Sequence, residues 1–154
     1  MDLIDNKATE IVYPSLDEII NPWQLVLYAN QLIREDPDCV GAWILLTKLY
    51  ILRREYVAAI SSCRRALELS PNSANLHSKL AVLLFRTEYM VEAGEHFKKA
   101  MHLEPESAKF VIDYAEFLLT FGRMDEALFY CQIAVALDPE NIWYKNLFYS
   151  LQVR

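Results

Sequence analysis

The chain has 154 residues, of which 54% are hydrophobic and 23% charged, a balance typical of a folded globular protein. Fifteen Lys and Arg against 21 Asp and Glu give a formal charge of −6, which argues against nucleic acid as a partner, because nucleic-acid binders normally carry a basic patch. The amino-terminal residues lack the basic and apolar regions of a signal peptide, and no apolar run approaches the length of a membrane span. We therefore expect a cytoplasmic protein without membrane insertion.

The first predicted helix begins at Asn21 and Pro22 and ends near Glu35. Asparagine is a favoured helix N-cap and proline is favoured at the first helical position, so this pair marks a helix start. Apolar residues recur along the segment at positions 23, 26, 27, 32 and 33. Residues 1–39 are therefore assigned to an amino-terminal segment that holds one helix, over about 22–35.

Prolines then recur at a constant interval of 34 residues, at Pro37, Pro71, Pro105 and Pro139. Each of the last three closes a similar apolar run: CRRALELSPNS, FKKAMHLEPES and CQIAVALDPEN. Such a run indicates a helix that ends at a turn, because proline lacks a backbone donor and disfavours helix in the preceding residue. The period defines three units, 40–73, 74–107 and 108–141. Their helices are predicted at 41–53 and 56–69, at 75–87 and 90–103, and at 109–121 and 124–137.

Small residues occupy the same positions in all three units. The three sets are Ala59, Ala93 and Ala127, then Ala66, Ala100 and Ala134, and finally Thr47, Ala81 and Ala115. Small residues let two helix backbones approach closely, so we expect each unit to be an antiparallel helix hairpin. After the third unit, Asn141 is the expected N-cap of a last helix, over 142–153 within the segment 142–154.

The first unit carries the pattern W-x-x-L-x-x-x-Y as Trp43, Leu46 and Tyr50, followed by Ala59, Ala66 and Pro71. This 34-residue unit resembles the tetratricopeptide repeat (TPR) family. The resemblance implies an all-α fold, an α-solenoid that forms a right-handed superhelix of three full helix hairpins. The helix over 22–35 would be a degenerate half repeat, and the helix of 142–154 a capping half repeat.

Two turns depart from the family pattern. Arg54 and Glu88 stand where the third unit has Gly122, so these two turns lack a residue that readily adopts a positive φ.

No sequence motif predicts catalysis, because the chain has no glycine-rich phosphate loop, no HExxH, no GxSxG and no CxxC pair. His77, His96 and His102 fall at different repeat positions, so we expect them on different faces and not in a metal site. Cys63 and Cys131 share one repeat position and are expected to be small core residues. We predict that the protein is not an enzyme and has no catalytic residues, no metal and no cofactor.

The TPR resemblance implies that ligands lie along the concave surface, which the first helix of each unit lines. The residues that map to this surface are Ile44, Lys48, Leu52, Asn75, Ser78, Val82, Phe85, Arg86, Lys109, Ile112, Glu116 and Leu119. They combine apolar side chains with an excess of basic ones. We therefore expect a protein-protein interaction adaptor, or scaffold, that binds a peptide segment in this groove.

One TPR subclass, the Hsp90 and Hsp70 co-chaperones, holds a C-terminal carboxylate in a clamp of five Lys, Arg and Asn residues. The clamp positions in this chain are Ile44, Lys48, Lys79, Lys109 and Asp113. Only Lys109 matches the clamp, and the Asp113 carboxylate would repel the ligand. We expect no clamp for EEVD tails.

The last helix carries more apolar side chains than one helix face can bury. Trp143, Tyr144, Phe148 and Tyr149 are candidates for a second interface, either with a partner or in a homodimer through this helix. Two alternative functions stay open: a chaperone of the translocator-binding kind from bacterial type III secretion, and a TPR accessory domain of a longer regulator.

Overall fold

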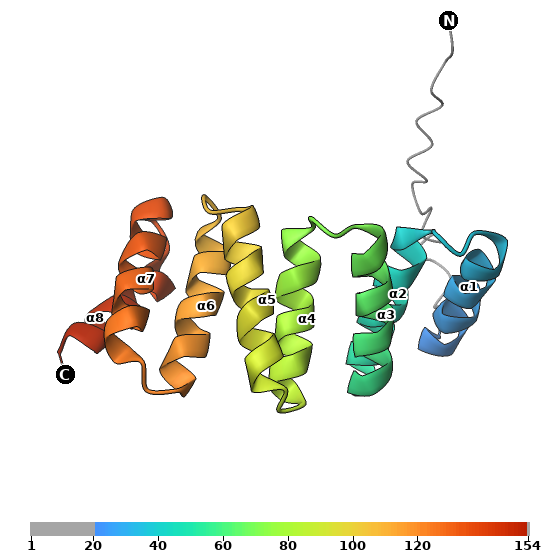
Figure 1. Cartoon of the computed structure of the whole chain (residues 1–154), viewed down its shortest axis with the longest axis horizontal. Coiled ribbons are helices and arrows are strands. Elements are labelled where there is room, and N and C mark those ends of the chain that lie inside the picture. Colours follow the sequence, from blue (N-terminus) through green and yellow to red (C-terminus); the bar gives the residue numbers. More distant parts are fainter. Residues whose placement is uncertain (1–20, 154) are drawn as a thin grey trace, which may run out of the picture.

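The computed structural model describes residues 21–153, which fold into eight helices with no strand among them. The helices are α1 (Pro22–Glu35), α2 (Val40–Leu52), α3 (Tyr56–Leu69), α4 (Ala74–Arg86), α5 (Met90–Leu103), α6 (Ala108–Thr120), α7 (Met124–Leu137) and α8 (Ile142–Gln152). They stand in a row in chain order (Figure 1). The predicted all-α solenoid is confirmed. The amino-terminal stretch that bears on a signal peptide lies outside the described residues.

Within residues 21–153, no helix is both long enough and apolar enough to cross a lipid bilayer.

Side-chain caps fix several helix starts. The Asn21 side chain accepts a hydrogen bond from the Trp23 amide at 3.1 Å, and the Gln24 side chain accepts one from the Asn21 amide at 3.1 Å. This reciprocal pair is a capping box. In α4 the hydroxyl of Ser73 accepts from the Leu76 amide at 3.4 Å, so Ser73 is the N-cap. The first helix of each hairpin begins one residue earlier than predicted.

The hairpin turns all use a positive φ at the same repeat position. Gly122 has φ 69°, Arg54 has φ 59° and Glu88 has φ 67°. Side chains with a Cβ are strained in this conformation by about 1 to 2 kcal/mol. Arg54 and Glu88 therefore adopt the backbone geometry of a glycine instead of avoiding it.

The small residues predicted to lie between the two helices of each hairpin are buried. Ala59, Ala93 and Ala127 are fully buried, and the other two sets of small residues are at most 1% exposed. Packing is most extensive within the pairs α2–α3, α4–α5 and α6–α7. One core cluster extends from α3 to α8, and a smaller one joins α1 to α2.

Candidate functional site

Two cavities lie next to each other along the first helices of the hairpins. One, of about 700 Å³, is lined by α2, α4 and their neighbouring turn and helix ends. The other, of about 450 Å³, is lined by residues of α4 and α6 and by Phe97 of α5. Val82 and Arg86 of α4 line both cavities, so the two form one continuous groove.

The larger cavity is basic. Its charged lining residues are Arg54, Lys79, Arg86 and Lys109, and none of the described residues that line it is acidic. Its apolar lining includes Leu52, which is 75% exposed. We call this part the basic cavity.

A short polar network fixes the border between the two cavities. The Lys109 ammonium lies 2.8 Å from a carboxylate oxygen of Asp113, and the Ser78 hydroxyl donates to the same oxygen at 3.2 Å. Ser78 is 5% exposed, so its hydroxyl serves this network and is not presented to a ligand. Lys109 is partly neutralised by Asp113, and the positive potential of the basic cavity therefore rests mainly on Arg54, Lys79 and Arg86.

The smaller cavity is aromatic. Phe85, Phe97 and Phe117 line it, with the Phe117 ring centre 6.1 Å from that of Phe85 and 5.4 Å from that of Phe97. The Phe117 ring reaches this place because α5 has a glycine beside it: a Cβ on Gly94 would lie 2.8 Å from the ring. We call this part the aromatic cavity.

Two carboxylates form the acidic edge of the aromatic cavity. Asp113 and Glu116 of α6 both line it. Burial, and then the nearby Asp113 carboxylate, raise the pKa of Glu116 above its ordinary value. The groove is thus basic over α2 and α4 and acidic over α6.

The structure does not bring all the predicted groove residues to this groove. Ile112 is 2% exposed and belongs to the core, so it cannot contact a ligand. Ile44 and Leu119 are half-buried against the core, because neighbouring helices of the stack cover part of each first helix. Lys48 is exposed on α2 but lines neither cavity.

The groove residues predicted from the sequence that do line a cavity are Leu52, Asn75, Ser78, Val82, Phe85, Arg86, Lys109 and Glu116.

Several groove residues could not be recognised from the sequence. Arg54 lies in a hairpin turn, Phe97 shares the repeat position of Cys63 and Cys131 that was expected in the core, and the repeat pattern did not single out Phe117. Lys79 and Asp113 were considered only as positions of the carboxylate clamp. The excess of basic residues among the positions mapped to the concave surface was the one signal that pointed toward the basic cavity.

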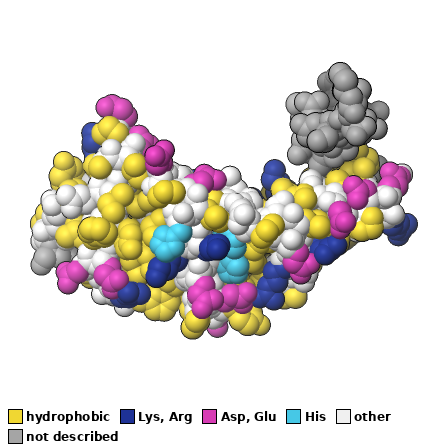
Figure 2. Space-filling view, turned by 45° about the horizontal axis from the view of Figure 1, so that its top comes forward, with side chains coloured by type: hydrophobic (Ala, Val, Ile, Leu, Met, Phe, Trp, Pro, Cys, Tyr) yellow, Lys and Arg dark blue, Asp and Glu magenta, His cyan; other side chains and the backbone are white. Residues whose placement is uncertain are grey.

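The second predicted interface divides between core and surface. Tyr144 is 9% exposed and packs in the core, and Phe148 is half-buried against it. Trp143 is 49% exposed and Tyr149 57% exposed, so these two side chains are accessible to a partner. Figure 2 shows hydrophobic side chains gathered over the half of the molecule that contains α6 to α8.

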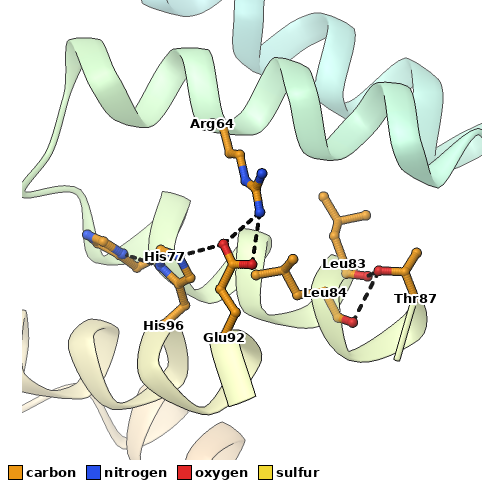
Figure 3. Close-up of polar contacts among 7 residues, drawn as sticks. All are labelled: Arg64, His77, Leu83, Leu84, Thr87, Glu92 and His96. Atoms are coloured by element: carbon orange, nitrogen blue, oxygen red, sulfur yellow. Dashed lines mark hydrogen bonds and ion pairs between the residues drawn. The ribbon is translucent and has the colours of Figure 1, made fainter. Parts of the chain in front are cut away.

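Two histidines expected on different faces meet between α4 and α5. Nδ1 of His77 lies 2.8 Å from Nδ1 of His96 (Figure 3). Nε2 of His77 lies 3.0 Å from the carbonyl oxygen of Pro71. Because a carbonyl only accepts, neutral His77 carries its proton on Nε2, and the Nδ1–H of His96 donates to it. The prediction that these residues lie apart was wrong, because their repeat positions face each other within one hairpin.

The bond from His77 to Pro71 has a counterpart in the first unit. Nε1–H of Trp43, at the same repeat position, donates to the carbonyl oxygen of Pro37 at 2.9 Å. Histidine can therefore replace the tryptophan of the repeat pattern because both rings present an N–H to the preceding turn.

The histidine pair is linked to the preceding hairpin by an ion pair. Arg64 of α3 makes two contacts with the Glu92 carboxylate, at 2.7 and 2.9 Å, and Glu92 lies 3.8 Å from Nε2 of His96. Burial, followed by the effect of His77, lowers the pKa of His96. The ring of His96 is therefore neutral at pH 7. No cluster in the described part of the chain has three or more potential metal ligands.

Cys63 and Cys131 are fully buried, as predicted. Burial raises the pKa of each thiol to about 11, so neither is a reactive thiolate at neutral pH.

Comparison with known proteins places these repeats in a family. Tetratricopeptide repeat models match residues 27–74 and 90–147. The type IV pilus assembly protein PilF of Pseudomonas aeruginosa is 36% identical over 87 residues, which cover 56% of this chain and 34% of PilF. The BBSome complex member BBS4 of Bos taurus is 27% identical over 86 residues, which cover 56% of this chain and 17% of BBS4. The chain thus spans about a third or less of these curated relatives.

Solved structures share the fold at low sequence identity. MamA superposes with a TM-score of 0.77 at 17% identity, over 91% of this chain and 84% of MamA. The TPR2B domain of yeast Sti1, solved in a complex with pHsp70, gives 0.66 at 20% identity over 75% of this chain and 98% of that domain. YrrB, a TPR protein with an unusual peptide-binding site, superposes with a TM-score of 0.70 at 17% identity, over 85% of this chain and 69% of YrrB. From its period, its helix hairpins and both family matches, the chain belongs to the tetratricopeptide repeat family.

Proposed function

We propose that the protein is a non-enzymatic adaptor that holds a peptide segment of a partner protein in the groove along α2, α4 and α6. The observation that carries the proposal is the pair of adjoining cavities, whose volumes of about 700 and 450 Å³ lie in the range of ligand sites. Leu52 and Val82 present apolar surface there, 75% and 39% exposed. Exposed apolar side chains beside oriented charges are typical of peptide grooves.

The comparisons support the same class of partner. The Sti1 domain forms a complex with pHsp70, and YrrB has a peptide-binding site. PilF and BBS4 are named for pilus assembly and for the BBSome complex. We propose by analogy that the partner of this chain is a protein subunit of a larger assembly.

The groove does not favour an EEVD tail as its ligand. Asp113 holds Lys109, the one residue that matches the carboxylate clamp, in an ion pair of 2.8 Å. A second carboxylate from the ligand would have to compete with Asp113 for this ammonium group.

Selection from a peptide library tests the proposal. A random peptide library is selected on the wild-type protein, and the recovered peptides are titrated by calorimetry against two variants. The first is the double variant Leu52→Glu with Val82→Glu. The control is Val57→Glu, which changes an equally apolar side chain, 77% exposed, that lines neither cavity.

We expect the double variant to weaken binding about a hundredfold, since two exposed apolar side chains that the peptide would cover are replaced by charges. The control should bind like wild type, and circular dichroism should show equal helicity in all three proteins. Equal affinity for the wild type and the double variant would reject the groove as the binding site.

A homodimer through α8 stays a prediction. Its test is the molar mass by light scattering over a range of concentrations, for wild type and for Trp143→Glu with Tyr149→Glu. A mass that is monomeric at every concentration would reject it.

A further inference from the structure

We infer that the occupant of the groove is an acidic peptide segment with one aromatic anchor: its carboxylates lie over the basic cavity and its ring enters the aromatic cavity. The inference rests on the proposed function and adds the chemical class of the partner.

The charges of the basic cavity select the acidic part. Arg54, Lys79 and Arg86 line it, and in the part of the chain that the structure describes none of the three has an ion-pair partner. The chain as a whole carries −6, so this cluster is a local exception to its net charge. Unpaired cations around an open cavity attract a partner with carboxylates, and salt screens that attraction.

The rings of the aromatic cavity select the anchor. Phe85 and Phe117 stand edge to face at an interplanar angle of 73°, an arrangement that a further ring can extend. Because an apolar cavity of about 150 Å³ suffices for benzene, a cavity of about 450 Å³ has room for one aromatic side chain.

The two preferences have a fixed order along the groove. Asp113 and Glu116 edge the aromatic cavity and would repel carboxylates there. Val82 and Arg86 line both cavities, so the anchor and the nearest acidic residue must be close neighbours in the ligand. The acidic stretch therefore lies on the α2 side of the anchor.

Synthetic peptides test this chemistry directly. The probe is a fluorescein-labelled peptide of consecutive Asp and Glu residues next to one phenylalanine, followed by anisotropy titration of the full chain. Two matched peptides replace the phenylalanine with alanine, or all acidic residues with their amides. We expect each replacement to weaken binding about tenfold or more. Added salt should weaken the binding of only those peptides that carry acidic residues.

A matched pair of variants tests the protein side. Arg54→Gly removes a cation of the basic cavity at a turn where glycine is favoured by the positive φ of 59°. Glu88→Gly makes the same change at the equivalent turn, with φ 67°, where the residue lines neither cavity. Both variants should fold, and only Arg54→Gly should lower the affinity for the acidic peptide, by about threefold to tenfold.

The outcomes separate the inference from the proposed function. If library peptides bind in the groove but the acidic aromatic probe binds no better than its amide or alanine versions, the inference is wrong and the adaptor function stands. If no peptide binding responds to Leu52→Glu with Val82→Glu, both are wrong. If light scattering shows a wild-type dimer that Val82→Glu converts to a monomer, a second copy fills the groove and the inference is overturned.

Discussion

At the scale of single residues, the hairpin turns show where local strain is kept. Arg54 and Glu88 hold a positive φ that Gly122 adopts freely. The strain persists because the turn must reverse the chain within a few residues to bring two helices into contact at their alanines.

Replacing the strained residues with glycine should therefore stabilise the protein. Relief of about 1 to 2 kcal/mol of strain exceeds the entropy that glycine adds to the unfolded chain. We expect Arg54→Gly and Glu88→Gly to raise the free energy of unfolding by about 0.5 to 1 kcal/mol each, measured in urea. The reverse change, Gly122→Ala, should lower it by about 1 kcal/mol. A lower free energy of unfolding in both glycine variants would contradict the view that Arg54 and Glu88 are strained by their positive φ.

The histidine pair adds a dependence on pH at the same scale. His96 donates to His77 and is surrounded by Arg64, Glu92 and Glu95. Burial is the first cause of its lowered pKa, and His77 and Arg64 lower it further, while the two glutamates act in the opposite direction.

Stability should consequently fall in acid. Because the folded protein lowers the pKa of His96 below 6.5, the unfolded chain binds more protons as the pH drops through about 6.5. We expect the urea midpoint to decline from pH 7 to pH 5, and to decline less in His96→Gln, whose amide can still donate to His77. His102 is exposed, so His102→Gln should keep the wild-type decline. Identical curves for all three proteins would exclude this role of His96.

At the scale of helices, alanine determines which helices approach closely. Within the three hairpins, the small residues at the three repeated positions are buried, whereas the two end helices have larger residues at the equivalent repeat positions. Tyr149 of α8 corresponds to Thr47, Ala81 and Ala115, and it is 57% exposed. In α1, Leu25 and Leu32 correspond to the two alanines of the second helices. The outer faces of α1 and α8 therefore lack the small residues of a close helix contact.

Enlarging one of the hairpin alanines should separate the helices. We expect Ala93→Leu to lower the free energy of unfolding by about 1 to 3 kcal/mol, since Ala93 of α5 is fully buried and a larger side chain would overpack its surroundings. Ala136→Leu is the matched control on the exposed side of α7, and its effect should stay within about 0.5 kcal/mol. Chemical denaturation compares the two. Equal effects would mean that the contact is loosely packed.

At the scale of the whole molecule, the stack is held mainly by contacts between consecutive helices. Stability in such an array is approximately a sum over repeats and their interfaces, so the ends open more easily than the middle. The amino-terminal end is the weaker one, because α1 is held by a small cluster of Val26 and Ala29 against α2. The helices α4 and α5 lie within the large core cluster.

Amide hydrogen exchange should follow this gradient. We expect the fastest exchange among the helices in α1 and the slowest in α4 and α5. Val26→Ala should speed exchange in α1 while leaving α4 and α5 unchanged, because it removes contacts only at that end. Uniform protection along the row of helices, or a change that spreads to α5, would show a single cooperative unit instead.

The helices themselves could be predicted from the sequence with little error. The second helices of the hairpins occupy the predicted residues 56–69, 90–103 and 124–137, and the first helices are displaced by one residue. The small residues expected between the two helices of each hairpin are buried, as that prediction requires. Both follow from a strict period, since a position that recurs every 34 residues must meet the same neighbours in each unit.

The groove could be predicted only in part. The sequence places Ile112 and Val82 on first helices at positions that map to the same surface, yet one is 2% and the other 39% exposed. The difference arises from how neighbouring helices cover each side chain, which depends on their packing and not on the repeat position alone. The same reason explains why Phe97, at a repeat position expected in the core, lines the aromatic cavity.

By itself, the sequence determined the repeat, the helix boundaries, the small-residue contacts and the family, because each depends on spacing along one chain. Only the tertiary structure decided which side chains remain open to a ligand, that Asp113 holds Lys109, and that His77 meets His96. These features depend on distances between residues of different helices, and such distances are set when the helices pack.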